Sequence, residues 1–421
     1  MKKINVNREV NWHFENKRVS RLYFFFIFMM YALVYMTKNC FNGALADIKA
    51  SNIMSASEAG LIVAMFYIAY TPLQIVGGIV ADKVSPECLI KIGIGGAAIA
   101  NAVIFFNHNY YVMLVTWTLN AMVQFALWPS VYKIVSSQLC RSDRGFMIFL
   151  ISMASSVGLL ISYLVAAVLP SWEYNFLISA LVLIALVIGM HIYDSYVSCY
   201  AIKDSPQEER GNLEIKRDVS TASLLWRSGF FILLLTVLVR AVVSQGVQTL
   251  SPLMLVETFS AEPWLSNLLN TLIIICGIVG SLLVKFVLYP RVIKNEAVGI
   301  LIIMAIFLAL GSMLLLTSSN MSATVVNLCL MSVIATVPTI LTSYFNAGFA
   351  KYGKNGTAAG ISNSAASLGF VVSSYGITSI AESAGWGAVR LTWIGMLAVS
   401  VATMIPVVFM YVSFKRREES N

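Results

Sequence analysis

Long apolar runs separated by short polar stretches repeat along the whole chain. Each run contains about 20 predominantly apolar residues, the length that an α-helix needs to cross ~30 Å of hydrocarbon. Two groups of six such runs stand on either side of a polar stretch at 203–220. The runs lie near residues 22–46, 58–81, 88–107, 110–138, 146–169, 175–198, 228–256, 265–288, 296–317, 323–349, 355–381 and 388–414. This pattern predicts an all-α membrane protein with twelve transmembrane helices in two pseudo-symmetric six-helix bundles.

The polar segments between the runs set the expected domain boundaries. We expect a cytoplasmic N-terminal tail at 1–21, six-helix bundles at 22–199 and 226–414, a cytoplasmic linker at 200–225 and a cytoplasmic tail at 415–421. The first of these segments is polar and basic, without an early apolar stretch or a cleavage site, so we expect no signal peptide.

The composition excludes a soluble globular protein. Hydrophobic residues make up 58% of the 421 positions and charged residues only 11%, and the mean hydropathy is +0.80. The six cysteines occur singly and the three histidines are scattered, so we expect neither a disulfide framework nor a metal site. The sequence contains no G-x-x-x-x-G-K-[ST] loop and no evident nucleophile–base pair, and we therefore expect neither an enzyme nor a cofactor.

The distribution of Lys and Arg indicates the orientation of the chain. When both termini are placed in the cytoplasm, all but four of the 28 basic residues fall on the cytoplasmic side, as the positive-inside rule requires. Lys49 and Arg390 fall outside, and Lys38 and Arg240 lie within apolar runs. The net charge of +8 is thus a signal of topology. We expect a multi-pass protein of the bacterial inner membrane with no nucleic-acid partner, because the basic residues form no single patch.

Lys38 and Arg240 are the candidate binding residues, one in each half of the chain. A cation near the bilayer centre costs about 2.5–3.5 kcal/mol even on a lenient insertion scale. Neither apolar run supplies an acidic residue to offset this cost. A water-filled cavity that binds an anion would explain both charges, whereas a cation satisfied by backbone carbonyls is the structural alternative.

Other polar residues recur at helical spacing beside these cations. Tyr31, Tyr35 and Lys38 follow i, i+4, i+7 and share one helix face. Arg240 and Gln248 are eight residues apart, which also places them on one face of a regular helix. For any single polar residue, a hydrogen bond between helices is the alternative. We expect anion contacts from Tyr31, Tyr35, Lys38 and Arg240, and contacts with the uncharged part of the ligand from Gln74, Gln124, Trp128 and Gln248.

A loop motif in the first half resembles a known family signature. The segment Gly78-Ile-Val-Ala-Asp82-Lys83 resembles the G-x-x-x-D-[R/K] loop of the major facilitator superfamily, and the resemblance implies the major facilitator fold. We expect Gly78 to let neighbouring helices approach closely, and Asp82 to face a helix N-terminus or a basic partner in one alternating-access state. The candidate gating residues are Gly78, Asp82, Lys83, Lys133 and Arg144.

A narrower resemblance runs through both halves. Tyr31-Ala-Leu-Val-Tyr35-Met-Thr-Lys38-Asn39 resembles the Y-x-x-x-Y-x-x-[R]-[K/N] pattern of the organophosphate:phosphate antiporters, the glycerol-3-phosphate and hexose-phosphate carriers. Gln124 and Trp128, an i, i+4 pair beside a proline that can bend the helix, match the Q-x-x-x-W-P pattern of that family. Asp143-Arg144-Gly145 is similar to its acidic-Arg-Gly loop, and the run that contains Arg240 ends in Ser-Pro as in the family. The resemblance implies that the residues at positions 38 and 240 bind a phosphate.

The chain departs from that family at the site itself. Lys38 stands where the family has an arginine, which keeps the charge but loses the bidentate fork that suits phosphate. Gln74 and Ser155 stand where the glycerol-phosphate members have a lysine and a histidine. A carboxylate substrate such as a sugar acid is therefore an open alternative.

The sequence as a whole predicts a secondary transporter of a small organic anion, of the sugar-phosphate or glycerol-phosphate type, that works by anion exchange. All acidic residues lie in tails, loops or helix ends, which disfavours proton coupling through a buried Asp or Glu. We expect inorganic phosphate as the counter-substrate, contact with the lipid bilayer, and a monomer. A transporter-like sensor of external organophosphate is a second alternative, since its ligand site would look the same.

Overall fold

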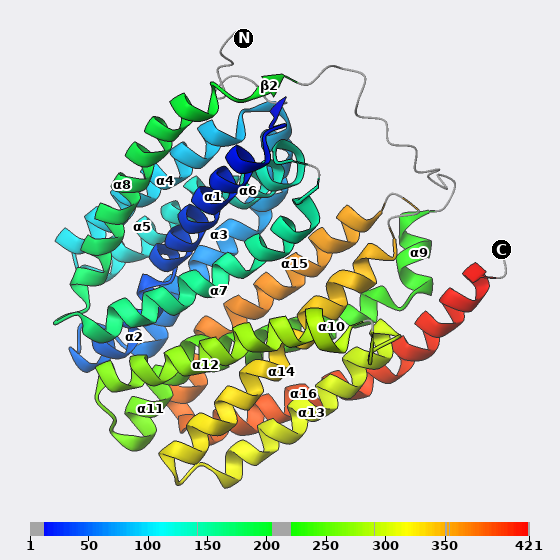
Figure 1. The fold of residues 1–421 in the computed structure, drawn as a ribbon. Coiled ribbons are helices and arrows are strands. Elements are labelled where there is room, and N and C mark those ends of the chain that lie inside the picture. Colours follow the sequence, from blue (N-terminus) through cyan, green and yellow to red (C-terminus); the bar gives the residue numbers. More distant parts are fainter. Residues whose placement is uncertain are drawn as a thin grey trace. The chain divides into compact units, whose positions relative to one another are not determined.

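The chain folds almost entirely into helices. The computed structural model describes residues 12–140, 142–203, 220–289, 291–349, 352 and 354–419. The chain divides into two compact units, Met1–Gly211 and Asn212–Asn421, coloured blue to green and green to red in Figure 1. The division falls within the expected linker at 200–225.

The first unit contains nine helical segments and two short strands within the part that the structure describes. Its elements are β1 (Trp12–His13), α1 (Lys17–Lys38), α2 (Cys40–Ala50), α3 (Ala56–Lys83), α4 (Pro86–Phe106), α5 (Tyr110–Val123), α6 (Leu127–Lys133), the π-helix η1 (Ile134–Gln138), α7 (Arg144–Val168), α8 (Glu173–Val197) and β2 (Ile202–Lys203). The described part of the second unit is helical throughout its regular structure. Its elements are α9 (Thr221–Arg227), α10 (Phe230–Gln245), the π-helix η2 (Gly246–Leu250), α11 (Ser251–Phe259), α12 (Pro263–Leu283), the π-helix η3 (Val284–Leu288), α13 (Glu296–Leu316), α14 (Met321–Ala347), α15 (Asn355–Val371), the π-helix η5 (Val372–Ile377) and α16 (Thr378–Glu419).

These helices are long and apolar enough to form a membrane domain. Eleven stretches of the described residues meet the length and hydropathy that a membrane span requires. The last stretch runs over 61 residues, Thr357–Arg417, and its backbone leaves the helical region at Gly385, where φ is 76° and ψ is 172°. An all-helical membrane protein is therefore confirmed.

Polar caps determine where several of these helices begin. Ser55 and Glu58 form a capping box at the start of α3, each side chain accepting a backbone hydrogen bond from the other residue. Ser85 followed by a proline begins α4, and Asn16 accepts backbone hydrogen bonds at the start of α1. The helix boundaries thus follow local side-chain chemistry as well as hydropathy.

The described part of the expected N-terminal tail, from Trp12 onward, packs onto the first unit. β1 pairs with β2 in an antiparallel arrangement, and the backbone N–H of Phe14 donates to the carbonyl of Gln138 at 2.9 Å. Trp12 and Phe14 are fully buried, and their rings pack edge to face with centroids 5.1 Å apart. The hydropathy windows miss this segment because it buries only isolated aromatic residues.

The expected helix over 110–138 is interrupted between α5 and α6. Pro129 has no backbone N–H, so the carbonyl of Phe125 cannot receive the usual helical hydrogen bond. Gly77 on α3 faces this break: a Cβ atom there would lie 2.4 Å from the Phe125 carbonyl oxygen and 3.1 Å from the Cα of Ala126. The missing side chain at position 77 therefore lets two backbones pack directly.

This packing corrects the expectation for the motif glycine. A Cβ atom at Gly78 would meet no atom within 4 Å, so Gly78 does not bring two helices close within the first unit. The adjacent Gly77 has that role. In the second unit, Gly280 on α12 makes the same kind of contact, since its Cβ would lie 2.4 Å from the carbonyl oxygen of Val333 on α14.

The contrast between the two neighbouring glycines gives a stability prediction. Gly77→Ala should lower the free energy of unfolding by about 1 kcal/mol or more, because the cost of overpacking against backbone exceeds the gain in helix propensity. Gly78→Ala should be neutral or slightly stabilising, since it gains the propensity without a clash. Melting temperatures of the two purified variants in detergent would check this, and equal melting temperatures would contradict it.

Candidate functional site

Lys38 is the last residue of α1, and aromatic rings surround its ammonium group. Only 9% of the residue is exposed. Its Nζ lies 3.9 Å from the ring centroid of Tyr70, 4.8 Å from Phe66, 5.2 Å from Tyr35 and 5.8 Å from Tyr67. We refer to these four residues as the aromatic box.

The aromatic box comes from two neighbouring segments of the first unit. Tyr35 lies one turn before Lys38 on α1, and Phe66, Tyr67 and Tyr70 lie on α3. Positions 66 and 70 are spaced i, i+4 and share a face of α3. An ammonium over a desolvated ring gains on the order of 2 kcal/mol. This attraction stabilises the charge without neutralising it.

Lys38 makes no ion pair with a carboxylate within the described ranges. Ion pairs elsewhere in the described ranges include Arg21–Asp143, Lys91–Asp194 and Lys415–Glu296. The Lys38 charge therefore stays available to an external anion.

Two further predicted residues lie close to this group. The ring of Tyr31 is centred 5.0 Å from that of Tyr35 and 5.4 Å from that of Trp128 on α6. The structure thus brings together Tyr31, Tyr35, Lys38 and Trp128. Gln74 is half-buried one turn after Tyr70, and its side chain contacts the Tyr70 hydroxyl.

Gln124 differs from its expected position. It lies at the end of α5, in the break before α6, so it does not form a regular i, i+4 pair with Trp128. Its amide is buried and donates to the side-chain oxygen of Asn120 at 2.7 Å. In this arrangement Gln124 bonds within its own segment.

Arg240 is the corresponding buried cation of the second unit. It lies on α10 with 8% of the residue exposed. The structure records no hydrogen bond, ion pair or ring contact of its guanidinium with any other described residue. Gly369 on α15 packs against Ala241, the residue that follows Arg240. A Cβ atom at position 369 would lie 2.6 Å from the Cβ atom of Ala241.

Gln248 does not follow Arg240 along a regular α-helix. It lies in η2, whose wider turns break the 3.6-residue repeat, so the predicted i, i+8 alignment with Arg240 is wrong. Its backbone carbonyl accepts a hydrogen bond from Asn270 at 2.9 Å.

The candidate gating residues have different surroundings. Lys83 is exposed at the end of α3. Lys133 donates to the carbonyl of Ala81 at 2.7 Å, which satisfies a free carbonyl at the end of α3. The side chains of Asp82 and Arg144 lie outside the described residues.

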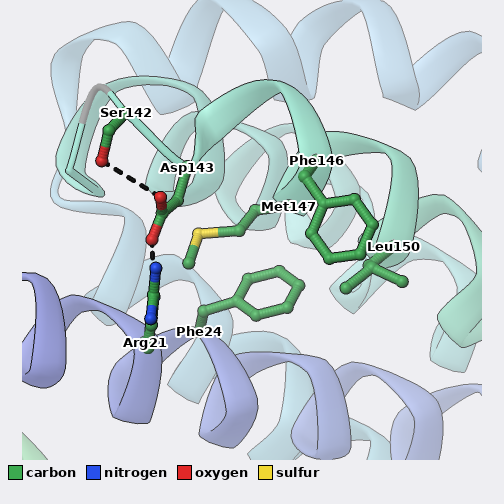
Figure 2. A pocket seen from close by; sticks show the side chains of 7 residues that line it. All are labelled: Arg21, Phe24, Ser142, Asp143, Phe146, Met147 and Leu150. Atoms are coloured by element: carbon green, nitrogen blue, oxygen red, sulfur yellow. Dashed lines mark hydrogen bonds and ion pairs between the residues drawn. The ribbon is translucent and has the colours of Figure 1, made fainter.

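Beside this set, Asp143 links the loop before α7 to α1. Figure 2 shows the Arg21 guanidinium donating to the Asp143 carboxylate, at 2.6 Å, at one end of a cavity of about 310 Å³. Phe24, Phe146 and Met147 are among its apolar lining residues. The hydrogen bond from Arg21 lowers the pKa of Asp143, so this carboxylate is charged at neutral pH.

Sequence reasoning missed several residues of functional interest. Phe66 and Tyr70 were not recognised, although aromatic residues at i, i+4 facing a lone lysine are a usable signal. Arg390 was expected on the outer side of the membrane, at the start of the run at 388–414; it lies within α16 and is 6% exposed, with its Nε and Nη2 atoms buried and without a partner among the described residues. Within the same residues, no three His, Cys, Asp or Glu side chains are placed to hold a metal ion.

Comparisons with known proteins place the chain in a family. Residues 27–374 match the model of the Major Facilitator Superfamily. The membrane sensor protein UhpC of Salmonella typhimurium is 31% identical over 184 residues, which cover 43% of this chain and 40% of the sensor. A probable hexose phosphate transport protein of Chlamydia trachomatis is 24% identical over 285 residues, 62% of each chain. These matches confirm the resemblance to the organophosphate:phosphate antiporter family, and the chain spans less than two thirds of the length of each relative.

The fold has a close counterpart among solved structures. A bacterial homologue of the human lysosomal transporter Spinster, in an inward-facing and unoccupied conformation, has a TM-score of 0.68 at 13% identity, covering 95% of this chain and 98% of that one. At this identity the likeness concerns the fold alone. Together with the family match over most of its length, it shows that this chain belongs to the Major Facilitator Superfamily.

Proposed function

We propose that this protein is a secondary transporter that exchanges small phosphorylated organic anions across the bacterial inner membrane by alternating access. The observation that carries the proposal is the Lys38 ammonium, which is buried in a membrane span and has no carboxylate partner among the described residues. A charge of this kind is stabilised when a ligand of opposite sign binds it. Similarity to a hexose phosphate transport protein supports a phosphorylated ligand.

The architecture that we propose has twelve spans, in bundles at 22–199 and 226–414, with both termini in the cytoplasm and a monomeric state. A continuous helix of 61 residues would be about 90 Å long, three times the thickness of the hydrocarbon core. The non-helical backbone at Gly385 therefore supports two passes within Thr357–Arg417, which raises the count from eleven to twelve.

Each bundle contributes one cation to anion binding in this proposal. Lys38 and Arg240 bind the charged group, and Tyr31 and Tyr35 line its site beside Lys38. The uncharged part of the substrate contacts the residues assigned to it from the sequence, namely Gln74, Gln124, Trp128 and Gln248. Because the Gln124 amide donates a hydrogen bond to Asn120, contact between Gln124 and the substrate requires that this hydrogen bond break.

Exchange follows from the same charges. An empty carrier has to take unneutralised cations through an occluded, low-dielectric state, whereas a bound anion compensates them. Return with a second anion is therefore faster than return empty. Inorganic phosphate is the counter-substrate that fits a phosphate site.

A sensor is the second candidate function. The observation that favours it is the similarity to the membrane sensor protein UhpC of two bacteria, at 31% and 30% identity over 184 residues. A sensor would bind the same anion through the same residues but would not carry it across the membrane. Binding and flux must therefore be measured separately.

The two cations give the first functional prediction. Lys38→Gln and Arg240→Gln should each reduce uptake of a hexose phosphate into proteoliposomes by at least about 30-fold, the effect of losing one desolvated charged contact of ~2 kcal/mol. Lys285→Gln is the matched control, because that lysine is exposed on η3 and should leave uptake unchanged. Wild-type uptake in both cation variants would exclude the proposed site.

The counter-substrate gives the second functional prediction. Proteoliposomes loaded with inorganic phosphate should take up hexose phosphate several-fold faster than vesicles loaded with chloride, since exchange avoids the empty carrier. Stimulation by an internal sugar acid and not by phosphate would favour a carboxylate transporter. Tight binding of hexose phosphate with no flux under either condition would favour the sensor.

A further inference from the structure

We propose that the aromatic box competes with the transported anion for the Lys38 ammonium, so that it weakens anion binding and stabilises the empty carrier. The box comprises Tyr35, Phe66, Tyr67 and Tyr70, as defined above. This inference rests on the proposed function, because it concerns how the same lysine binds its anion.

The geometry leaves little of the ammonium surface free. Four ring centroids lie between 3.9 and 5.8 Å from Nζ, and an ammonium has only three N–H groups to direct. An anionic oxygen would approach to about 2.8 Å, closer than any of these rings. Because only 9% of the residue is exposed, in this proposal such an oxygen approaches along a direction that now faces a ring. Binding therefore replaces at least one cation–π contact with a charge-assisted hydrogen bond.

Competition follows because the rings stabilise the free state more than the bound state. An anion that must displace a ring binds less tightly than one that meets an exposed ammonium. The Tyr70 ring is the nearest, at 3.9 Å, and it is itself buried. Removal of this ring should therefore increase the affinity for the anion.

The box also affects the empty carrier. Lys38 and the four aromatic residues all belong to the first unit, so their contacts persist if that unit moves as a rigid body. The ammonium is then stabilised in every state of the transport cycle, including the empty occluded one. Arg240 has no such ring contact among the described residues. The box thus lowers the energy barrier for the return of the empty carrier. A larger share of transport can then occur without exchange for a second anion.

Two substitutions at Tyr70 distinguish the effect of the ring from the effect of the hydroxyl. Its hydroxyl contacts Gln74, whereas its ring faces Lys38. Tyr70→Phe removes the hydroxyl and keeps the ring, and Tyr70→Leu removes the ring as well. Phe66→Leu removes a second ring, whose centroid lies 4.8 Å from the Lys38 Nζ. This variant replaces Tyr70→Leu in the test if Tyr70→Leu does not fold.

The experiment measures affinity and flux in the same full-length variants. Binding of inorganic phosphate is measured by calorimetry at about pH 6, where the ammonium form of lysine is favoured. Tyr70→Leu should bind phosphate about 30-fold more tightly than the wild type, the effect of one desolvated ring contact, and Tyr70→Phe should match the wild type. In proteoliposomes loaded with hexose phosphate, the ratio of exchange to net efflux should rise about tenfold in Tyr70→Leu.

The outcomes separate this inference from the proposed function. Unchanged or weaker phosphate binding in folded Tyr70→Leu and Phe66→Leu overturns the competition, even if Lys38→Gln abolishes binding and so supports the anion site. Wild-type binding in Lys38→Gln removes the site itself, and the competition with it. Tighter binding in the leucine variants, lost again when Lys38→Gln is added, supports both.

Discussion

A positive charge buried in a membrane span without a carboxylate partner is the constraint on which the site depends. Such a charge is costly in hydrocarbon, so the surrounding protein must supply polar or polarisable groups, water or a ligand. The two candidate cations meet this requirement differently. Lys38 faces the quadrupoles of four aromatic rings, whereas Arg240 has no recorded ring contact or ion pair with another described residue. The chain thus keeps both charges unneutralised but stabilises only one of them in the absence of a ligand.

Helical irregularity coincides with the candidate site residues in both units. Lys38 ends α1 just before the junction with α2. Gln124 lies in the gap between α5 and α6, and Gln248 lies in the π-helix that follows α10. Broken or widened helices expose backbone polar groups, which a membrane protein tolerates only where protein or a polar cavity surrounds them. The same positions therefore combine polar side chains with an irregular backbone, a combination that occurs at the binding sites of membrane carriers.

Hydropathy and charge predict the span positions well, because length and polarity decide which segments can cross a bilayer. They do not predict the gap at 124–126 or the buried Trp12 and Phe14, since both depend on contacts between segments far apart in the sequence. The motif glycine shows the same limit. Two adjacent glycines look alike in the sequence, and only the position of the α5–α6 break shows that Gly77 packs against the backbone while Gly78 does not.

Side-chain surroundings within the spans were the least predictable part. The spacing of Tyr31, Tyr35 and Lys38 on one helix could be read directly. The rings on α3 could not be assigned to Lys38, because helical periodicity gives the face of a residue but not the helix that the face meets. Arg390 is a further example. Its place at the start of the last apolar run indicated the outer side of the membrane, and nothing in the pattern indicated that the helix after Gly385 buries it.

Two of the buried carboxylates are bound by partners away from the candidate cations. Glu87, at the start of α4, is fully buried and accepts hydrogen bonds from the hydroxyls of Ser85 and Tyr23. Glu296, at the start of α13, accepts hydrogen bonds from Tyr289 and Tyr411 and forms an ion pair with Lys415.

Each of these acids lies in the first turn of a helix, where the helix dipole and free N–H groups favour a negative charge, and each has its partners within its own unit. A carboxylate bound in this way cannot also neutralise a cation in the middle of a span. The division of charge therefore follows position for these groups: Glu87 and Glu296 lie at helix ends with their own partners, whereas Lys38 lies among aromatic rings.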